Sequence, residues 1–82
     1  MVKVKYDDRF IGVVNKIKDA SVKESIYKKI EKIVQNPEIG KPMRNVRKGT
    51  REVYVGSFRL SYAYYKDEDL IEFLEFYHKD EQ

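Results

Sequence analysis

The chain has 82 residues, of which 41% are hydrophobic and 38% charged, and its formal net charge is +3. This length allows one domain, which we expect to span residues 1–82. The absence of cysteine excludes disulfides and thiol nucleophiles, and a single histidine disfavours a histidine-based metal site, so no metal or cofactor is expected. No apolar run approaches the roughly 20 residues of a membrane helix. Since the N-terminus also lacks the apolar stretch of a signal peptide, we expect a cytoplasmic protein without a membrane partner.

The first predicted elements are a strand and a helix. Residues 2–6 alternate between apolar and polar side chains, which is the period of a half-buried strand. Asp7 or Asp8 then offers a carboxylate that can cap the N-terminus of a helix. Apolar residues at helical spacing follow over residues 10–17 and predict the first helix.

A second helix is predicted after a short break. Ser21 and Glu24 form the S-x-x-E pattern of a capping box. Residues 22–34 carry an apolar stripe on one side and lysines on the other, and Asn36 followed by Pro37 ends the helix. Two helices joined by a few residues indicate a helical hairpin.

The C-terminal half predicts a loop over residues 38–50 and then three strands, at residues 52–55, 58–65 and 70–77. Gly56 and Ser57 are typical of a two-residue hairpin turn. Apolar residues on both faces of the last strand, with Leu70, Leu74 and Phe76 opposite Ile71 and Phe73, favour a central position. The element order is therefore β-α-α-β-β-β, and we expect an α+β fold with the helical hairpin packed on a four-stranded, mainly antiparallel sheet.

Charge is unevenly distributed. Five basic and no acidic residues lie between positions 41 and 51, whereas seven acidic residues and two lysines lie between 66 and 82. A basic cluster is typical of a surface that binds phosphate groups, although a solvated loop is an equally good interpretation. The candidate RNA-binding residues in it are Lys41, Arg44, Arg47 and Lys48.

Arg59 is the clearest candidate for chemistry. It follows the predicted turn, and strict alternation places the small side chains of Ser61 and Ala63 on its face, beside a shallow floor where an anion could meet the guanidinium. Arginine suits phosphate because its planar fork donates two parallel hydrogen bonds. The alternative is an arginine paired with Glu52 or Glu75.

Three further residues are candidate catalytic groups. Arg51 opens the strand next to Arg59, and His78 and Lys79 follow the last strand directly. A histidine in a positive field titrates near neutral pH and can transfer protons, although a lone histidine is more often a surface or packing residue. Tyrosines are frequent in the strands, where they can stack on bases or fill the core.

Several of these segments resemble the RelE/ParE toxin superfamily. The matching stretches are residues 40–43, 51–55, 56–62 and 76–80, which include the turn into Phe58-Arg59-Leu60 and the final His78-Lys79 pair. The resemblance extends over about the whole chain and implies a RelE-like fold. It also implies a toxin of a type II toxin–antitoxin pair that, in the RelE branch, cleaves messenger RNA on the ribosome without a metal.

The resemblance assigns roles residue by residue. Arg59 and Lys79 would stabilise the charge on phosphate while the 2′-hydroxyl attacks it, and Arg51 would bind phosphate or help to activate that hydroxyl. RelE-type members usually have a tyrosine after the basic run, where this chain has only residues 80–82; His78 offers a substitute acid or base.

Other outcomes also agree with the resemblance. The ParE branch poisons DNA gyrase, and a catalytically weakened homologue would retain antitoxin binding alone. The expected partners are a RelB-like antitoxin that wraps the sheet and covers the basic surface, together with the ribosome and messenger RNA.

Overall fold

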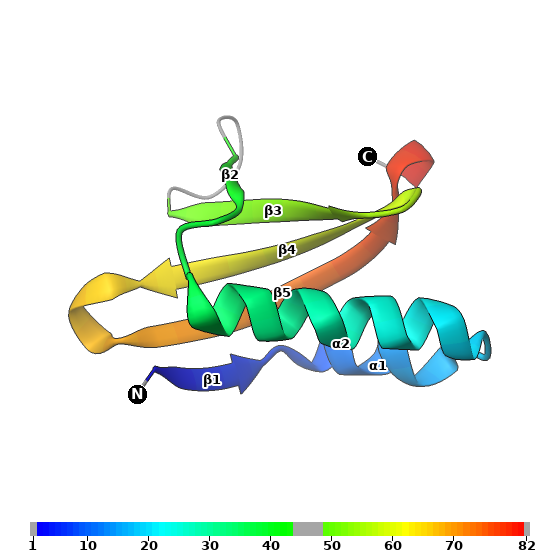
Figure 1. Cartoon of the computed structure of the whole chain (residues 1–82), viewed down its shortest axis with the longest axis horizontal. Helices are drawn as coiled ribbons and strands as arrows, with labels where there is room; N and C mark the ends of the chain where they lie inside the picture. The colour runs from blue at the N-terminus through cyan, green and yellow to red at the C-terminus, as the bar shows by residue number, and fades with distance from the viewer. Residues whose placement is uncertain (1, 44–48, 82) are drawn as a thin grey trace.

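The computed structural model describes residues 2–43 and 49–81, in which two helices lie on one side of a twisted sheet (Figure 1). The sheet has five strands in the order β1-β5-β4-β3-β2; β1 is parallel to β5 and the other pairs are antiparallel. This confirms the expected α+β fold. The helices are α1 (Asp8–Lys16) and α2 (Ala20–Gln35), and the strands are β1 (Lys3–Tyr6), β2 (Lys41–Pro42), β3 (Thr50–Val55), β4 (Phe58–Tyr65) and β5 (Leu70–His78).

The fifth strand is the difference from the expected four. Strand β2 has two residues, and Lys41 pairs with Glu52 while Pro42 pairs with Arg51. Two residues are too few to show an alternating pattern, and a proline two positions after a glycine is typical of a loop. Proline is tolerated here because β2 lies at the edge of the sheet, where no further strand needs its missing N–H.

Both helices begin at an aspartate. The Asp7 carboxylate accepts the Arg9 backbone N–H at 2.8 Å, as predicted. The capping box at Ser21 was wrong, because α2 begins earlier and Asp19 is its N-cap. The Ser21 backbone N–H and hydroxyl both donate to Asp19 Oδ1, at 2.9 and 2.8 Å. These bonds lower the pKa of Asp19, since they favour the charged carboxylate.

The three C-terminal strands form a meander around one irregularity. The turn between β3 and β4 is tight, with Val55 paired to Phe58 and Gly56 at φ 60°, a conformation that glycine adopts without strain. Between β4 and β5 the register shifts, because Ser61 pairs with Glu75 whereas Tyr62 pairs with Phe73. Leu74 is therefore an extra residue in β5, a β-bulge.

The bulge corrects the expected faces of β5. Simple alternation would place Phe76 on the face opposite Phe73, whereas both belong to the buried cluster beneath the helices. The strand is central, as predicted, since β5 lies between β1 and β4.

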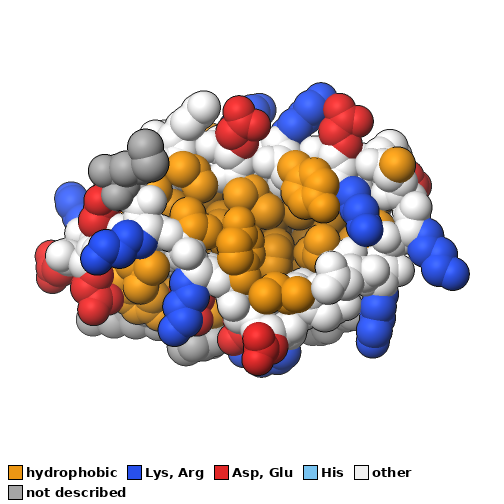
Figure 2. All heavy atoms as spheres, turned by 90° about the horizontal axis from the view of Figure 1, so that it is seen from below, with side chains coloured by type: hydrophobic (Ala, Val, Ile, Leu, Met, Phe, Trp, Pro, Cys, Tyr) orange, Lys and Arg blue, Asp and Glu red, His pale blue; other side chains and the backbone are white. Residues whose placement is uncertain are grey.

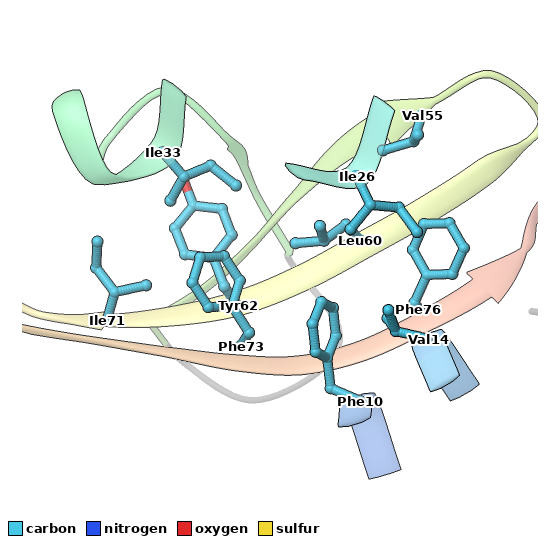
Figure 3. Packing of buried hydrophobic residues seen from close by; sticks show 10 residues of the cluster. All are labelled: Phe10, Val14, Ile26, Ile33, Val55, Leu60, Tyr62, Ile71, Phe73 and Phe76. Carbon is cyan, nitrogen blue, oxygen red and sulfur yellow. The ribbon is translucent and has the colours of Figure 1, made fainter. Parts of the chain in front are cut away.

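The core lies between the helices and the sheet (Figure 3). Phe10 and Val14 from α1 and Ile26 and Ile33 from α2 pack on strand residues that are almost fully buried, among them Leu60, Tyr62, Ile71, Phe73 and Phe76. The rings of Phe73 and Phe10 lie 5.7 Å apart. Within the described residues, no helix is long and apolar enough to cross a membrane.

Tyr62 fastens the segment after α2 to the sheet. Its hydroxyl donates to the carbonyl of Pro37 at 2.8 Å and accepts the N–H of Gly40 at 2.9 Å. The approach is so close that a Cβ on Gly40 would lie 2.7 Å from the Tyr62 hydroxyl oxygen. Burial raises the pKa of Tyr62 because the charged phenolate would lose its water.

Candidate functional site

The sheet face opposite the helices carries the candidate site, and we call it the open face. Paired residues on neighbouring strands share a face. Tyr54 pairs with Arg59 and Arg59 pairs with Tyr77, so these three side chains form one row across β3, β4 and β5. In the adjacent row Lys41, Glu52, Ser61 and Glu75 follow one another from β2 to β5.

Arg59 is half-buried and held by Tyr54. Its guanidinium carbon lies 3.9 Å from the centre of the Tyr54 ring, within the range of a cation–π contact. One nitrogen, Nη1, donates to the carbonyl of Phe58 at 3.1 Å. Among the residues that the structure describes, no carboxylate lies within 4.0 Å of this guanidinium, so the expected alternative of a pair with Glu52 or Glu75 is not found.

The floor beside Arg59 differs from the expectation. Ser61 and Ala63 share the open face, as alternation predicted, but each is only 4% exposed. The guanidinium lies over the aromatic ring of Tyr54, which is 50% exposed. The side chain that orients Arg59 is therefore a tyrosine on the neighbouring strand, because a cation gains more from a π-face than from small side chains.

Arg51 lies on the other face of the sheet. It pairs with Tyr62, whose ring is in the core, and its Nη1 donates to the carbonyls of Glu38 and Gly40 at 3.0 and 2.8 Å. Arg51 is on the strand next to Arg59, as expected, but the structure does not bring the two guanidinium groups together. Its hydrogen bonds fix the turn after α2.

His78 and Lys79 separate at the end of β5. His78 pairs with Phe58 on the helix side, where the two rings meet edge to face at 5.3 Å, and its Nδ1 accepts the Asp80 backbone N–H at 3.2 Å. The Lys79 side chain is exposed, and its backbone N–H donates to the carbonyl of Ser57 at 2.9 Å. Lys79 therefore lies beside the turn that leads to Arg59, whereas His78 is on the face away from it.

The basic segment is described only in part. Lys41 is exposed, and its ammonium lies 6.0 Å from the ring centre of Tyr54, so it stands beside the Arg59 row. The other three predicted RNA-binding residues, Arg44, Arg47 and Lys48, lie outside the described residues.

Sequence reasoning missed two residues near Arg59. The Tyr77 hydroxyl donates to Glu52 Oε2 at 3.0 Å, although the two residues are separated by strand β4. Strict alternation along β5 gave no reason to place Tyr77 and Arg59 on one face, because the bulge at Leu74 was not recognised. The polar pattern of β3 alone could have suggested Glu52, since it and Tyr54 alternate with Val53 and Val55.

Two grooves lie elsewhere on the surface. One, of about 490 Å³, is bordered by β1, α1 and α2, with Tyr6, Ile11 and Tyr27 at its rim. Figure 2 shows the apolar side chains that gather on this face of the molecule, ringed by charged ones. The other, of about 240 Å³, lies at the sheet edge between α2 and β3 and includes Lys29, Lys32 and Lys41. Within the described ranges, no cluster of acidic and histidine side chains could hold a metal ion.

The fold and the sequence together define a small toxin of the RelE/ParE superfamily. Residues 4–82 match the family described as ParE toxin of type II toxin-antitoxin system, parDE, and the chain belongs to this family. It is thus the toxin of a type II toxin–antitoxin system. No curated protein sequence matches the chain significantly.

Solved structures agree on the fold. The intact Escherichia coli RelBE toxin–antitoxin complex contains a chain with TM-score 0.81 and 18% identity, covering 95% of this chain and 96% of that one. The RelBE2 complex of Mycobacterium tuberculosis gives TM-score 0.80 and 19% identity over 94% and 96%. A YoeB/ParE toxin from Agrobacterium tumefaciens gives TM-score 0.83 and 15% identity over 94% and 98%. The fold is therefore RelE-like.

Proposed function

We propose that this toxin is a ribosome-dependent endoribonuclease that cleaves messenger RNA by attack of a 2′-hydroxyl on the adjacent phosphate. The observation that carries the proposal is Arg59. Its guanidinium is half-buried and oriented by Tyr54, and no carboxylate of the described residues pairs with it. A fixed cation without a counter-ion is suited to an anionic partner such as phosphate.

The chemistry requires charge stabilisation more than covalent catalysis. As the 2′-oxygen attacks, negative charge builds up on the phosphate oxygens, and Arg59 can donate the hydrogen bonds that it does not make to Phe58. Lys79 follows the adjacent strand and adds a second positive charge at the same end of the sheet. Arg51 is not included, because its guanidinium is engaged by Glu38 and Gly40 on the helix side.

The test is cleavage of messages on translating ribosomes, mapped by primer extension. Wild-type protein should cut, and Arg59→Ala should cut about 10²–10³-fold more slowly, the usual effect of removing one fixed donor to a transition-state oxyanion. Arg9→Ala is the matched control, since Arg9 is an exposed arginine on α1 that pairs with Asp7. Absence of cutting by wild type, or equal cutting by Arg59→Ala, would sink the proposal.

A second candidate target is DNA gyrase, favoured by the match to the ParE family. In that case the purified toxin would inhibit supercoiling by gyrase in the absence of ribosomes, and messages would remain intact. A toxin that binds its antitoxin but neither cuts RNA nor inhibits gyrase would be a weakened homologue. The two assays together separate all three outcomes.

The proposed partner is a RelB-like antitoxin. The apolar groove bordered by β1, α1 and α2 supports this, because Ile11 and Tyr27 expose large apolar surfaces that an amphipathic helix could cover. Tyr27→Glu should weaken a co-purified antitoxin complex at least tenfold and leave RNA cleavage by the free toxin unchanged. An unchanged complex would place the antitoxin on another surface.

A further inference from the structure

We propose that the groove at the sheet edge binds the messenger RNA strand on one side of the phosphate that Arg59 holds. This inference rests on the proposed RNA cleavage and extends the substrate contact from one phosphate to a length of single-stranded RNA. We call this groove, of about 240 Å³, the edge groove. Its walls come from α2, from Ile39 and from residues 41 and 52–54 of the two strands at the sheet edge.

Three lysines border the edge groove. Lys29 and Lys32 lie three positions apart, so they share one face of α2, and Lys41 joins them from β2. Among the residues that the structure describes, no carboxylate lies within 4.0 Å of these three ammonium groups. By contrast, the neighbouring Lys28 pairs with Glu24 at 3.4 Å. Unpaired like charges around one groove repel one another, and a bound polyanion removes that repulsion.

The groove combines this positive rim with an apolar floor. Ile33 is fully buried beneath it, and Ile39 is 49% exposed at its side. The carboxylate that borders it, Glu52, accepts the Tyr77 hydroxyl at 3.0 Å, and three lysines against one carboxylate leave the groove positive. A positive surface beside apolar and aromatic side chains suits a single-stranded nucleic acid, whose phosphates meet the cations while its bases meet the apolar part.

Tyr54 connects the edge groove to the Arg59 row. It borders the groove, and its ring also carries the Arg59 guanidinium, 3.9 Å from the ring centre. The Lys41 ammonium lies 6.0 Å from the same centre. Half of Tyr54 is exposed, so it offers aromatic surface on which a base can stack. A strand whose phosphate lies at Arg59 therefore reaches the edge groove by passing one aromatic ring.

This continuity identifies the occupant as the message. Because Tyr54 belongs to both surfaces, a ligand in the edge groove lies next to the ligand of Arg59. The nucleotides that follow the scissile phosphate are covalently joined to it, so their effective concentration at the groove exceeds that of any separate RNA or acidic peptide.

The first experiment measures how salt affects the binding of a short, fully 2′-O-methylated single-stranded RNA, which cannot be cleaved. The groove variant carries Lys29→Gln, Lys32→Gln and Lys41→Gln. The control variant loses the same charge from helix positions outside the groove, by Lys16→Gln, Lys23→Gln and Lys28→Gln. Each phosphate contact on a single strand contributes about 0.7 to the slope of log K against log salt, so the groove variant should be about 2 units less steep than wild type.

The control variant should keep the wild-type slope. Should the groove variant not fold, as checked by circular dichroism, the double variant at the exposed Lys32 and Lys41 should be about 1.4 units less steep. No binding by wild type at low salt, or equal flattening in the groove and control variants, would overturn the inference.

Cleavage on translating ribosomes separates binding from chemistry in the same variants. The groove variant should need about 10–100-fold more toxin for half-maximal cleavage at physiological salt. Its rate at saturation should equal that of wild type, since the lysines contact the strand beyond the scissile phosphate. A slower rate at saturation with an unchanged half-maximal concentration would contradict a strand-binding role.

A crosslink identifies the RNA in the groove. The chain has no cysteine, so a single introduced one carries a photoreactive label to a chosen place. Ile39→Cys labels the edge groove, and Asp67→Cys labels the exposed turn at the far end of β4. On ribosomes whose message carries a 2′-O-methyl group at the cleavage site, the label at position 39 should crosslink to the message next to that site, and the label at position 67 should not.

A crosslink from position 39 to ribosomal RNA or to a ribosomal protein in place of the message would overturn the inference. Should wild type itself fail to cut, the proposed RNA cleavage fails, which is a distinct result, and the salt dependence still decides whether the edge groove binds single-stranded RNA.

Discussion

The same strands contribute side chains to both faces of the sheet, but the helix side forms the core whereas the open face carries the candidate site. Leu60 and Tyr62 of β4 point to the helices and have no exposed surface, whereas Arg59, between Phe58 and Leu60, points to the open face and rests on Tyr54. The two arginines of this hairpin show the difference well. Arg51 faces the helix side and donates to two backbone carbonyls, while Arg59 faces outward with no carboxylate partner among the described residues. The direction of a side chain, rather than its type or strand, decides whether it serves the fold or the site.

The largest expected effect compares adjacent residues on opposite faces. Leu60→Ala should lower the free energy of unfolding by about 2–5 kcal/mol, because Leu60 is fully buried and its removal leaves a cavity. Arg59→Ala should change it by no more than about 1 kcal/mol, the value of an exposed cation–π contact. Urea denaturation followed by circular dichroism measures both. Equal losses of unfolding free energy in the two variants would mean that Arg59 contributes as much to stability as the buried Leu60, which would contradict this division between the two faces.

A second prediction concerns the segment fastened by Tyr62. Gly40→Ala should destabilise the protein by about 1–3 kcal/mol, because the new Cβ would lie 2.7 Å from the Tyr62 hydroxyl and 3.0 Å from the Glu52 carbonyl oxygen. Gly12→Ala is the control. A Cβ there meets nothing within 4 Å, and alanine in the interior of α1 should stabilise the protein by about 0.5–1 kcal/mol. Thermal unfolding would show shifts of opposite sign.

The third prediction uses alkaline pH. Because burial raises the pKa of Tyr62, the unfolded chain loses this proton at a lower pH than the folded protein. The contribution to stability is present below the ordinary value of about 10 and is lost as the pH rises through the folded pKa. Wild type should therefore lose stability above about pH 10 more steeply than Tyr62→Phe. Parallel urea midpoints for the two proteins would contradict this.

The smallest effect is expected on the solvent side of α2. Glu24 and Lys28 form an exposed i,i+4 pair at 3.4 Å, with side chains 68% and 71% exposed. Glu24→Gln should lower stability by less than about 0.5 kcal/mol, since water screens such pairs. A loss of unfolding free energy above about 1 kcal/mol in urea denaturation would contradict this, because a water-screened pair cannot contribute so much.

Much of the fold could be predicted because its signals are local. The helices, the Gly56-Ser57 turn and the long strands follow from periodicity and from residues that cap or break elements. The start of α2 was missed because Asp19 and Ser21 are both favourable N-cap residues, and in the structure Ser21 donates its backbone N–H and its hydroxyl to Asp19. Strand β2 was missed because its two residues are defined as a strand only by their pairing with β3, and pairing between distant segments leaves no local pattern in the sequence.

Single residues of the site could be predicted from the sequence, but their arrangement across neighbouring strands could not. The chemistry of arginine identified Arg59, but its platform, Tyr54, comes from the cross-strand register, which depends on the exact length of the turn. Arg51 and His78 are separated from Arg59 because the strand register places them on the helix side of the sheet. Such information belongs to pairs of strands and is not carried by any single residue's neighbours in sequence.

The extra residue in β5 has a consequence for how members of this fold can diverge. The bulge leaves Leu74 unpaired, so the residues beyond it keep the partners and the faces that a regular strand without Leu74 would give them. Deleting Leu74 would make Phe73 and Glu75 consecutive partners of Tyr62 and Ser61, so Tyr77 would stay opposite Arg59 and His78 would stay on the helix side. A one-residue insertion at this point of β5 can thus be absorbed locally, while the residues beside Arg59 keep their places.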